Sequence, residues 1–116
     1  MNRRHFLLLT AAALAACGKK APKHSALPRG SAVLALGDSL TYGYGANPTE
    51  SYPARLAELT GWAITNGGVS GDTSAQALAR LPELLREHTP HLVIISIGGN
   101  DFLRRQPENE TRTNIR

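Results

Sequence analysis

The chain has 116 residues, which fits one domain, and its 41% hydrophobic and 19% charged residues are ordinary for a globular protein. The formal net charge of +4 is unevenly distributed, because residues 1–29 contain six of the 13 Lys and Arg and no acid, whereas the rest contain seven Arg and nine acids. The globular part is therefore mildly acidic, which argues against a nucleic-acid-binding surface.

The first segment, residues 1–16, has the pattern of a signal peptide. Arg3 and Arg4 precede an apolar run of eleven residues, too short to span a bilayer, which needs roughly 20 residues. The run closes on Leu14-Ala15-Ala16-Cys17, which resembles the lipobox of bacterial lipoproteins. The resemblance implies cleavage before Cys17 and acylation of this cysteine. The protein would then be anchored to a membrane of the bacterial cell envelope and face the periplasm.

Cys17 is the only cysteine, so the chain has no intrachain disulfide. The alternative, a buried cysteine in a cytosolic protein, fits less well with its position at the end of an Arg-led apolar run. Arg3-Arg4-His5-Phe6-Leu7 also resembles a twin-arginine signal, so both export routes stay open, as do the inner and outer membranes. After Cys17, the Lys, Pro and small residues up to Arg29 predict a flexible tether, followed by a domain over residues 30–116.

The first predicted strand, residues 31–36, stops abruptly at Gly37-Asp38-Ser39. An apolar run of strand length followed by such a break is typical of a buried parallel strand that turns toward a helix. Ligands in open α/β sheets bind at the carboxyl ends of such strands, which makes Ser39 a candidate nucleophile. The alternative is that Asp38 and Ser39 only cap the following helix.

A Gly-rich loop over residues 41–48 carries two Tyr, which either line a substrate groove or pack as lids. Residues 51–60 predict a helix that begins at Ser51 and ends before Gly61. Residues 62–65 predict a short second strand.

The turn Ser70-Gly71-Asp72 precedes a helix whose apolar residues keep helical spacing up to His88. Pro82 lies inside that pattern and predicts a kink or a break near Leu81.

The clearest strand covers residues 91–97, which are apolar almost throughout, as is typical of a strand covered on both faces. It ends in Gly98-Gly99-Asn100-Asp101, and residues 108–116 look like the start of a helix. This alternation of strands and helices predicts a doubly wound parallel sheet. Within this chain alone, the third strand would form an exposed sheet edge.

Each predicted strand thus ends in a small, polar turn, and these turns lie along one edge of a parallel sheet. Attack by Ser39 on an ester carbonyl would create a negatively charged oxygen, which the N–H groups of Ser39 and Gly71 and the side-chain amide of Asn100 can stabilise. Each turn taken singly is ordinary turn chemistry. Their occurrence in order at three strand ends favours a catalytic site.

These blocks resemble those of the GDSL or SGNH hydrolases: Gly37-Asp38-Ser39-Leu40, Gly71 within residues 66–74, and Gly99-Asn100-Asp101. Residues 70–74 and 79–82 are similar to the bacterial thioesterase, lysophospholipase and arylesterase branch. The resemblance implies a flavodoxin-like three-layer α/β/α fold, here truncated after the third strand. It also implies Ser39 as nucleophile, an oxyanion hole from the Ser39 N–H, Gly71 and Asn100, and no cofactor.

The family's fourth block, Asp-x-x-His, does not occur in this sequence. His5 and His24 belong to the signal peptide and the tether, and His88 and His91 flank the start of the third strand. That strand is roughly 20 Å long, whereas a base must come within about 3 Å of the proton that it takes. We therefore expect the N-terminal part of an esterase that is inactive for want of the catalytic His and Asp.

Two functions follow from these expectations. The first is a lipid-anchored serine esterase or thioesterase that hydrolyses acyl esters through a Ser39 acyl-enzyme. The alternative is a non-catalytic, membrane-anchored module that binds an acyl ligand in the same pocket. A metal site is not expected, because Asp38, Asp72 and Asp101 have turn or capping roles and no His accompanies them.

Overall fold

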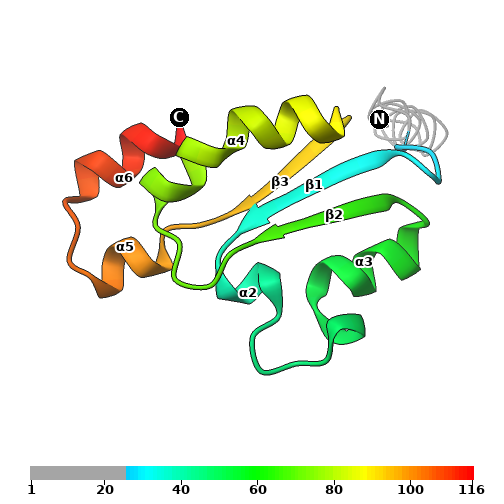
Figure 1. The fold of residues 1–116 in the computed structure, drawn as a ribbon, viewed down its shortest axis with the longest axis horizontal. Coiled ribbons are helices and arrows are strands. Elements are labelled where there is room, and N and C mark those ends of the chain that lie inside the picture. The colour runs from blue at the N-terminus through cyan, green and yellow to red at the C-terminus, as the bar shows by residue number, and fades with distance from the viewer. Residues whose placement is uncertain (1–25) are drawn as a thin grey trace, which may run out of the picture.

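The computed structural model describes residues 26–116, so the predicted signal peptide, Cys17 and most of the predicted tether lie outside the described residues. Strands and helices alternate along the chain, as the sequence predicts (Figure 1). In chain order they are β1 (Ala32–Gly37), α2 (Ser39–Tyr42), a 3₁₀ turn (Pro48–Glu50), α3 (Tyr52–Thr60), β2 (Ala63–Gly68), α4 (Ser74–His88), β3 (Leu92–Ser96), α5 (Gly99–Leu103) and α6 (Glu108–Ile115).

The three strands form a parallel sheet in the order β2-β1-β3. Gly37, at the end of β1, is paired with Gly68 of β2 and with Ser96 of β3. The carboxyl ends of all three strands therefore lie at one edge of the sheet. Helices α2 and α3 lie on one side of the sheet and α4 and α6 on the other, which gives three layers (Figure 1).

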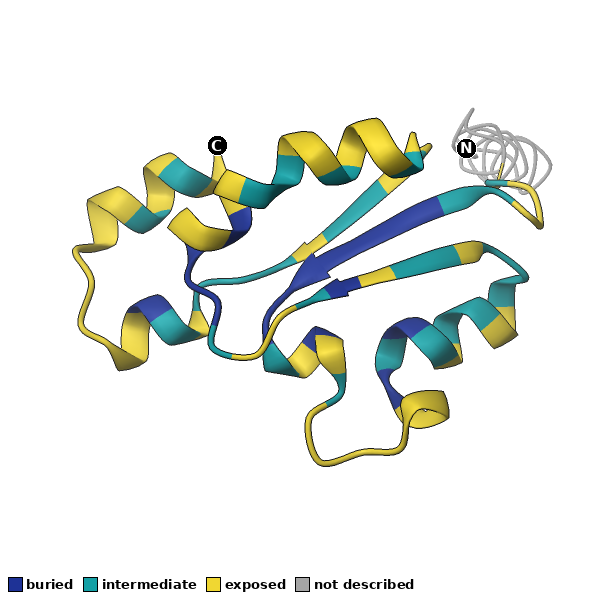
Figure 2. Ribbon diagram, in the orientation of Figure 1, coloured by how far each residue is buried: buried dark blue, intermediate teal, exposed yellow. Residues whose placement is uncertain are grey.

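Strand β1 supplies most of the core, because it has a neighbouring strand on each side and helices on both faces. Its residues 33–36 are at most 2% exposed, and Ala77 of α4 is buried with them. The third strand is less buried than β1 (Figure 2). Its Ile95 is 50% exposed. The prediction that β3 is covered on both faces is therefore wrong for the described structure, whereas its position at the sheet edge is confirmed. A sheet edge leaves one flank of a strand without neighbours.

Helix α3 begins and ends where the sequence predicts. The Ser51 hydroxyl accepts a hydrogen bond from the N–H of Ala54 at 3.4 Å, and Gly61 closes the helix with φ of +71°. Left-handed backbone of this kind favours Gly, which has no Cβ to clash.

Helix α4 begins with a capping box, in which Thr73 and Gln76 each bond the other's backbone N–H. It then continues through Pro82 to His88, so the break allowed for near Leu81 does not occur. Proline removes one backbone hydrogen bond, and a long helix packed on a sheet tolerates this loss. Among residues 26–116, no helix is long and apolar enough to cross a bilayer.

Candidate active site

Ser39 is the first residue of α2, directly after the buried strand β1. Gly37 makes this tight exit possible, because a Cβ there would collide with the Thr41 hydroxyl and would come within 2.7 Å of the Ser96 carbonyl oxygen. Asp38 is buried, and its Oδ1 accepts a hydrogen bond from the N–H of Leu40 at 3.0 Å. Asp38 thus caps the short helix, while Ser39 remains half-buried beside a pocket.

The turn before α4 carries Gly71, whose φ of +84° is accessible to Gly at little cost. The N–H of Asp72 donates to the carbonyl of Val69 at 3.2 Å and closes the turn. Within residues 26–116, the backbone N–H groups of Ser39 and Gly71 make no hydrogen bond with other protein atoms. Both are therefore free to donate to a ligand.

Asn100 lies in α5, one residue after the start of the helix. Its Nδ2 donates to the Asp72 carbonyl at 2.9 Å, which ties the end of β3 to the turn that carries Gly71. A carboxamide nitrogen has two N–H bonds, so one is left for another acceptor.

Ser39 and Asn100 line the same open pocket of about 230 Å³, together with Asp38, Leu40, Gly99 and Leu103. Gly71 does not line this pocket, but it adjoins Asp72, the residue that Asn100 binds. The structure thus brings two of the three predicted site residues to one pocket and the third beside it. Their chemical roles stay predictions.

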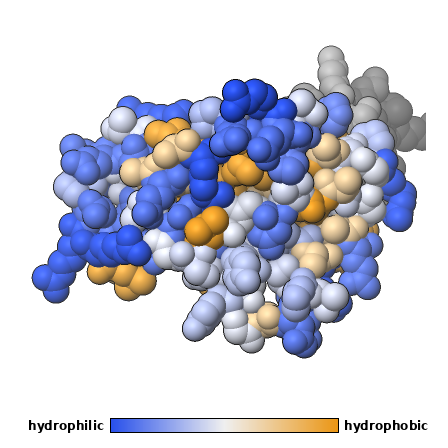
Figure 3. Space-filling model, in the orientation of Figure 1, coloured by the Kyte–Doolittle hydropathy of each residue, from blue (hydrophilic) through white to orange (hydrophobic). Residues whose placement is uncertain are grey.

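The pocket has an apolar rim. Leu40 is 75% exposed and Leu103 is 76% exposed, although both line it. Phe102, the residue before Leu103, is also exposed, and Figure 3 shows apolar surface over α5. Tyr42, one of the two loop tyrosines, lines a separate pocket of about 370 Å³ with Asn66 and Gly68.

A network around Asp101 holds α5 in place, and sequence reasoning assigned this residue only a turn role. Its Oδ1 accepts a hydrogen bond from the N–H of Ser74 at 2.7 Å, and its Oδ2 accepts the hydroxyls of Ser74 and Thr111. Asn114 also donates to the Ser74 hydroxyl, at 3.0 Å. The carboxylate therefore links α5 to the start of α4 and to α6, and it sits next to Asn100.

Asp101 is 4% exposed. Burial alone would raise the pKa of its carboxyl, but the hydrogen bonds from Ser74 and Thr111 favour the charged form and hold this pKa below the usual 3.8. Asp101 is thus a hydrogen-bonded carboxylate that favours its charged form, and it does not line the pocket of Ser39 and Asn100.

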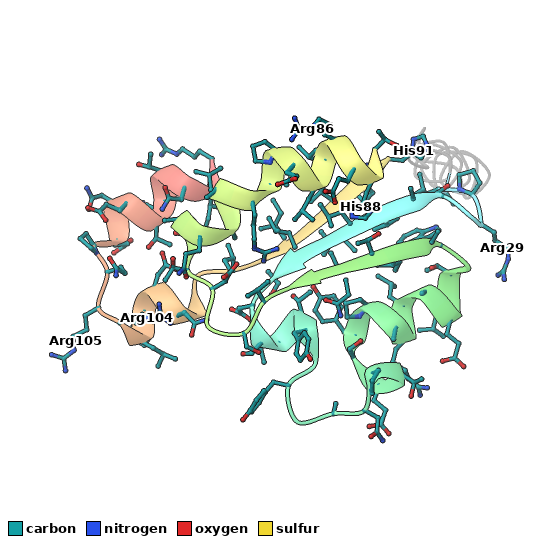
Figure 4. All side chains as sticks on the ribbon, in the orientation of Figure 1. Arg29, Arg86, His88, His91, Arg104 and Arg105 are labelled. Carbon is teal, nitrogen blue, oxygen red and sulfur yellow. The ribbon has the colours of Figure 1, made fainter. Side chains whose placement is uncertain are left out.

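His88 and His91 lie at the opposite edge of the sheet from the pocket, as expected (Figure 4). One ends α4 and the other precedes β3, whereas the pocket lies beyond the end of that strand. Within the described part of the chain, no His, Cys, Asp and Glu residues gather in a group that can hold a metal.

Comparison with known proteins gives consistent matches over the domain. The model of the GDSL-like lipase/acylhydrolase family matches residues 35–116. The "Thioesterase 1/protease 1/lysophospholipase L1" of Escherichia coli K12 is 42% identical over 88 residues, which are 72% of this chain and 41% of that protein. An arylesterase of Vibrio mimicus is 44% identical over 88 residues, 72% of this chain and 44% of its own length.

Solved structures of related proteins share the fold of this domain. The SGNH-hydrolase family esterase AlinE4 has a TM-score of 0.69 at 40% identity, over 78% of this chain and 51% of its own. A crystal structure of TesA has a TM-score of 0.70 at 37% identity, over 73% of this chain and 50% of its own. The predicted resemblance and the α/β fold class are confirmed. The chain spans 41–44% of the length of the curated relatives it matches.

Proposed function

The chain belongs to the GDSL-like lipase/acylhydrolase family, and from this premise we propose that its protein hydrolyses acyl esters or thioesters through Ser39. The observation that carries the proposal is the pocket that Ser39 shares with Asn100, at the sheet edge where the free N–H of Gly71 also lies. The esterases and thioesterases among the matched relatives support the same reaction class.

In the proposed reaction, the Ser39 oxygen attacks the acyl carbonyl carbon and its proton passes to a base. The alcohol or thiol then leaves with a proton, and water hydrolyses the resulting acyl-enzyme to release the acid. The N–H groups of Ser39 and Gly71 and the second N–H of Asn100 are proposed to stabilise the oxyanion. In a known protease, one such donor is worth about 3–4 kcal/mol of the barrier.

The described residues do not supply the base, since His88 and His91 lie at the far edge of the sheet. Proton transfer is therefore proposed to need an Asp-x-x-His block, which the 116 residues do not contain. The 116-residue chain by itself is expected to show little turnover. The oxyanion donors alone retain some rate enhancement over water.

The apolar rim of the pocket supports an acyl group as the substrate's recognised part. Leu40 and Leu103 flank Ser39 and Asn100 and expose apolar surface that a hydrocarbon chain would cover. The described residues add no basic side chain to the lining of this pocket. A neutral acyl ester fits such a lining.

The test is covalent labelling of the full-length protein with a fluorophosphonate probe, paired with hydrolysis of short and long acyl esters. Ser39→Ala is expected to abolish labelling and to lower hydrolysis at least about a thousandfold, whereas Ser31→Ala, which lies just before the start of β1, keeps both. Absence of labelling in a full-length protein that contains Asp-x-x-His would favour the non-catalytic acyl-binding module.

We also propose that acylated Cys17 anchors the protein to a bacterial membrane, facing the periplasm. The lipobox-like Leu14-Ala15-Ala16-Cys17 and the basic residues that precede it support this proposal. Metabolic labelling with an alkynyl fatty acid is expected to tag the protein, and Cys17→Ser is expected to remove the tag. A tag that survives this substitution would refute the proposal.

A further inference from the structure

Arg80 joins the structural parts that carry the proposed site residues. It lies in α4, on the opposite side of the sheet from α2, and its guanidinium reaches the carboxyl ends of two strands. One Nη donates to the carbonyl of Gly37 at 3.1 Å and to that of Gly67 at 2.8 Å. Gly37 precedes Asp38 and Ser39, so this contact supports the chain just before the nucleophile.

The same guanidinium holds the turn that carries Gly71. Its Nε donates to Asp72 Oδ2 at 2.7 Å, in an ion pair whose side chains are 26% exposed for Arg80 and 9% exposed for Asp72. Asp72 also accepts the side-chain N–H of Asn100 on its backbone carbonyl. Asp72 is thus bound through its side chain by Arg80 and through its backbone by Asn100.

From this geometry we infer that Arg80 is a positioning residue of the proposed active site. It fixes the turn that carries Gly71, and Asn100 through Asp72, relative to the end of β1 that carries Ser39. The inference rests on the proposed function, since it assigns Arg80 a role in the oxyanion hole of that reaction. Arg80 does not line the pocket and is given no contact with substrate.

Lysine cannot replace Arg80 in this role. The guanidinium is a rigid plane whose separate N–H groups reach three acceptors at once, whereas an ammonium group is a single point charge. Within the described residues, Arg80 is the side chain that hydrogen-bonds the Asp72 carboxylate. A nearly buried carboxylate without a well-placed partner is costly, so the turn is expected to shift toward water when Arg80 is shortened.

The experiment compares Arg80→Lys with the wild type in the full-length protein, on a chromogenic acyl ester. Arg86→Lys is the matched control, because Arg86 is exposed and lies in the same helix. Misplacing a group by about 1 Å costs about a hundredfold in rate. Arg80→Lys is therefore expected to lower kcat between about tenfold and a hundredfold and to change KM less than about twofold, while Arg86→Lys changes neither.

Two further measurements separate positioning from folding. The rate of fluorophosphonate labelling at Ser39 is expected to fall in parallel with kcat, at a temperature where circular dichroism shows the variant to be fully folded. If Arg80→Lys does not fold, Asp72→Asn serves in its place, because it weakens the same contact and leaves Arg80 on the two strand ends. It is expected to lower kcat with KM unchanged.

A folded Arg80→Lys or Asp72→Asn variant with kcat within about twofold of wild type would overturn the inference. So would an activity loss that only follows the unfolded fraction. If the wild type is active and labelled at Ser39 and the variant behaves like it, only the role of Arg80 is refuted. A wild-type protein that is neither active nor labelled refutes the proposed function and this inference with it.

Discussion

Replacing Asp101 with Asn tests the network that holds α5 against α4 and α6. The carboxylate is buried and accepts hydrogen bonds from the Ser74 N–H, the Ser74 hydroxyl and the Thr111 hydroxyl. Asn keeps one oxygen, but it places an N–H₂ group where the second oxygen accepted two hydroxyls. Hydrogen bonds to charged groups contribute about 1.5–3 kcal/mol each. The free energy of unfolding is therefore expected to fall by about 2–4 kcal/mol at pH 7.

The stabilisation by Asp101 is expected to depend on pH. The pKa of Asp101 in the folded protein lies below its usual value of 3.8, so the unfolded state binds the proton more readily. The stabilisation by this carboxylate is complete above the usual pKa and is lost as the pH falls through the lowered, folded-state pKa. The difference in stability between wild type and Asp101→Asn is therefore expected to shrink as the pH falls below about 4.

The assay is urea unfolding of the full-length wild type and variant, followed by circular dichroism between pH 7 and the acid limit of the folded state. Glu110→Gln is the control, because it also exchanges a carboxylate for an amide but at an exposed position. Its free energy of unfolding is expected to change by less than about 0.5 kcal/mol. Equal stability of wild type and Asp101→Asn at pH 7, or a difference independent of pH, would refute the account of this network.

Two substitutions test how β1 is built. Gly37→Ala is expected to prevent or severely destabilise folding, because the added Cβ has no space. Gly45→Ala has open space around its Cβ and is expected to cost only about 1–2 kcal/mol, because its backbone is left-handed. Soluble yield and thermal melting compare the two variants, and equal behaviour would contradict the close packing at Gly37. Leu34→Ala is expected to lower the free energy of unfolding by about 2–5 kcal/mol, because Leu34 is 0% exposed. Leu59→Ala, at an 81% exposed position, is expected to have little effect in the same denaturation assay, and a similar loss in both variants would contradict the placement of the core.

Local sequence patterns predicted the elements that carry the site, for a physical reason. A buried strand needs a continuous apolar run and a turn needs small, polar residues, so the end of β1 and the position of Ser39 were readable without long-range information. The same reasoning placed Gly71 and Asn100 at the corresponding edge, because parallel strands end together.

What the sequence did not predict depends on contacts between distant segments. Helix α5 was missed because Gly98 and Gly99 are typical of a turn, and the helix is held by Asp101 bonding to Ser74, 27 residues away. The contact of Arg80 with Gly37 spans 43 residues. No periodicity in the sequence indicates such a contact, so the proposed positioning role of Arg80 could not be predicted from the sequence.

The direction of β1 separates the entry of the chain from the pocket. Residues 28–31 enter the strand at one edge of the sheet, and Ser39 follows it at the other, roughly 20 Å away. A covalent link to a solid support, made at residues 28–31 themselves, would therefore attach at the sheet edge opposite the pocket. The protein immobilised in that orientation would present the pocket that Ser39 shares with Asn100 to the surrounding solution.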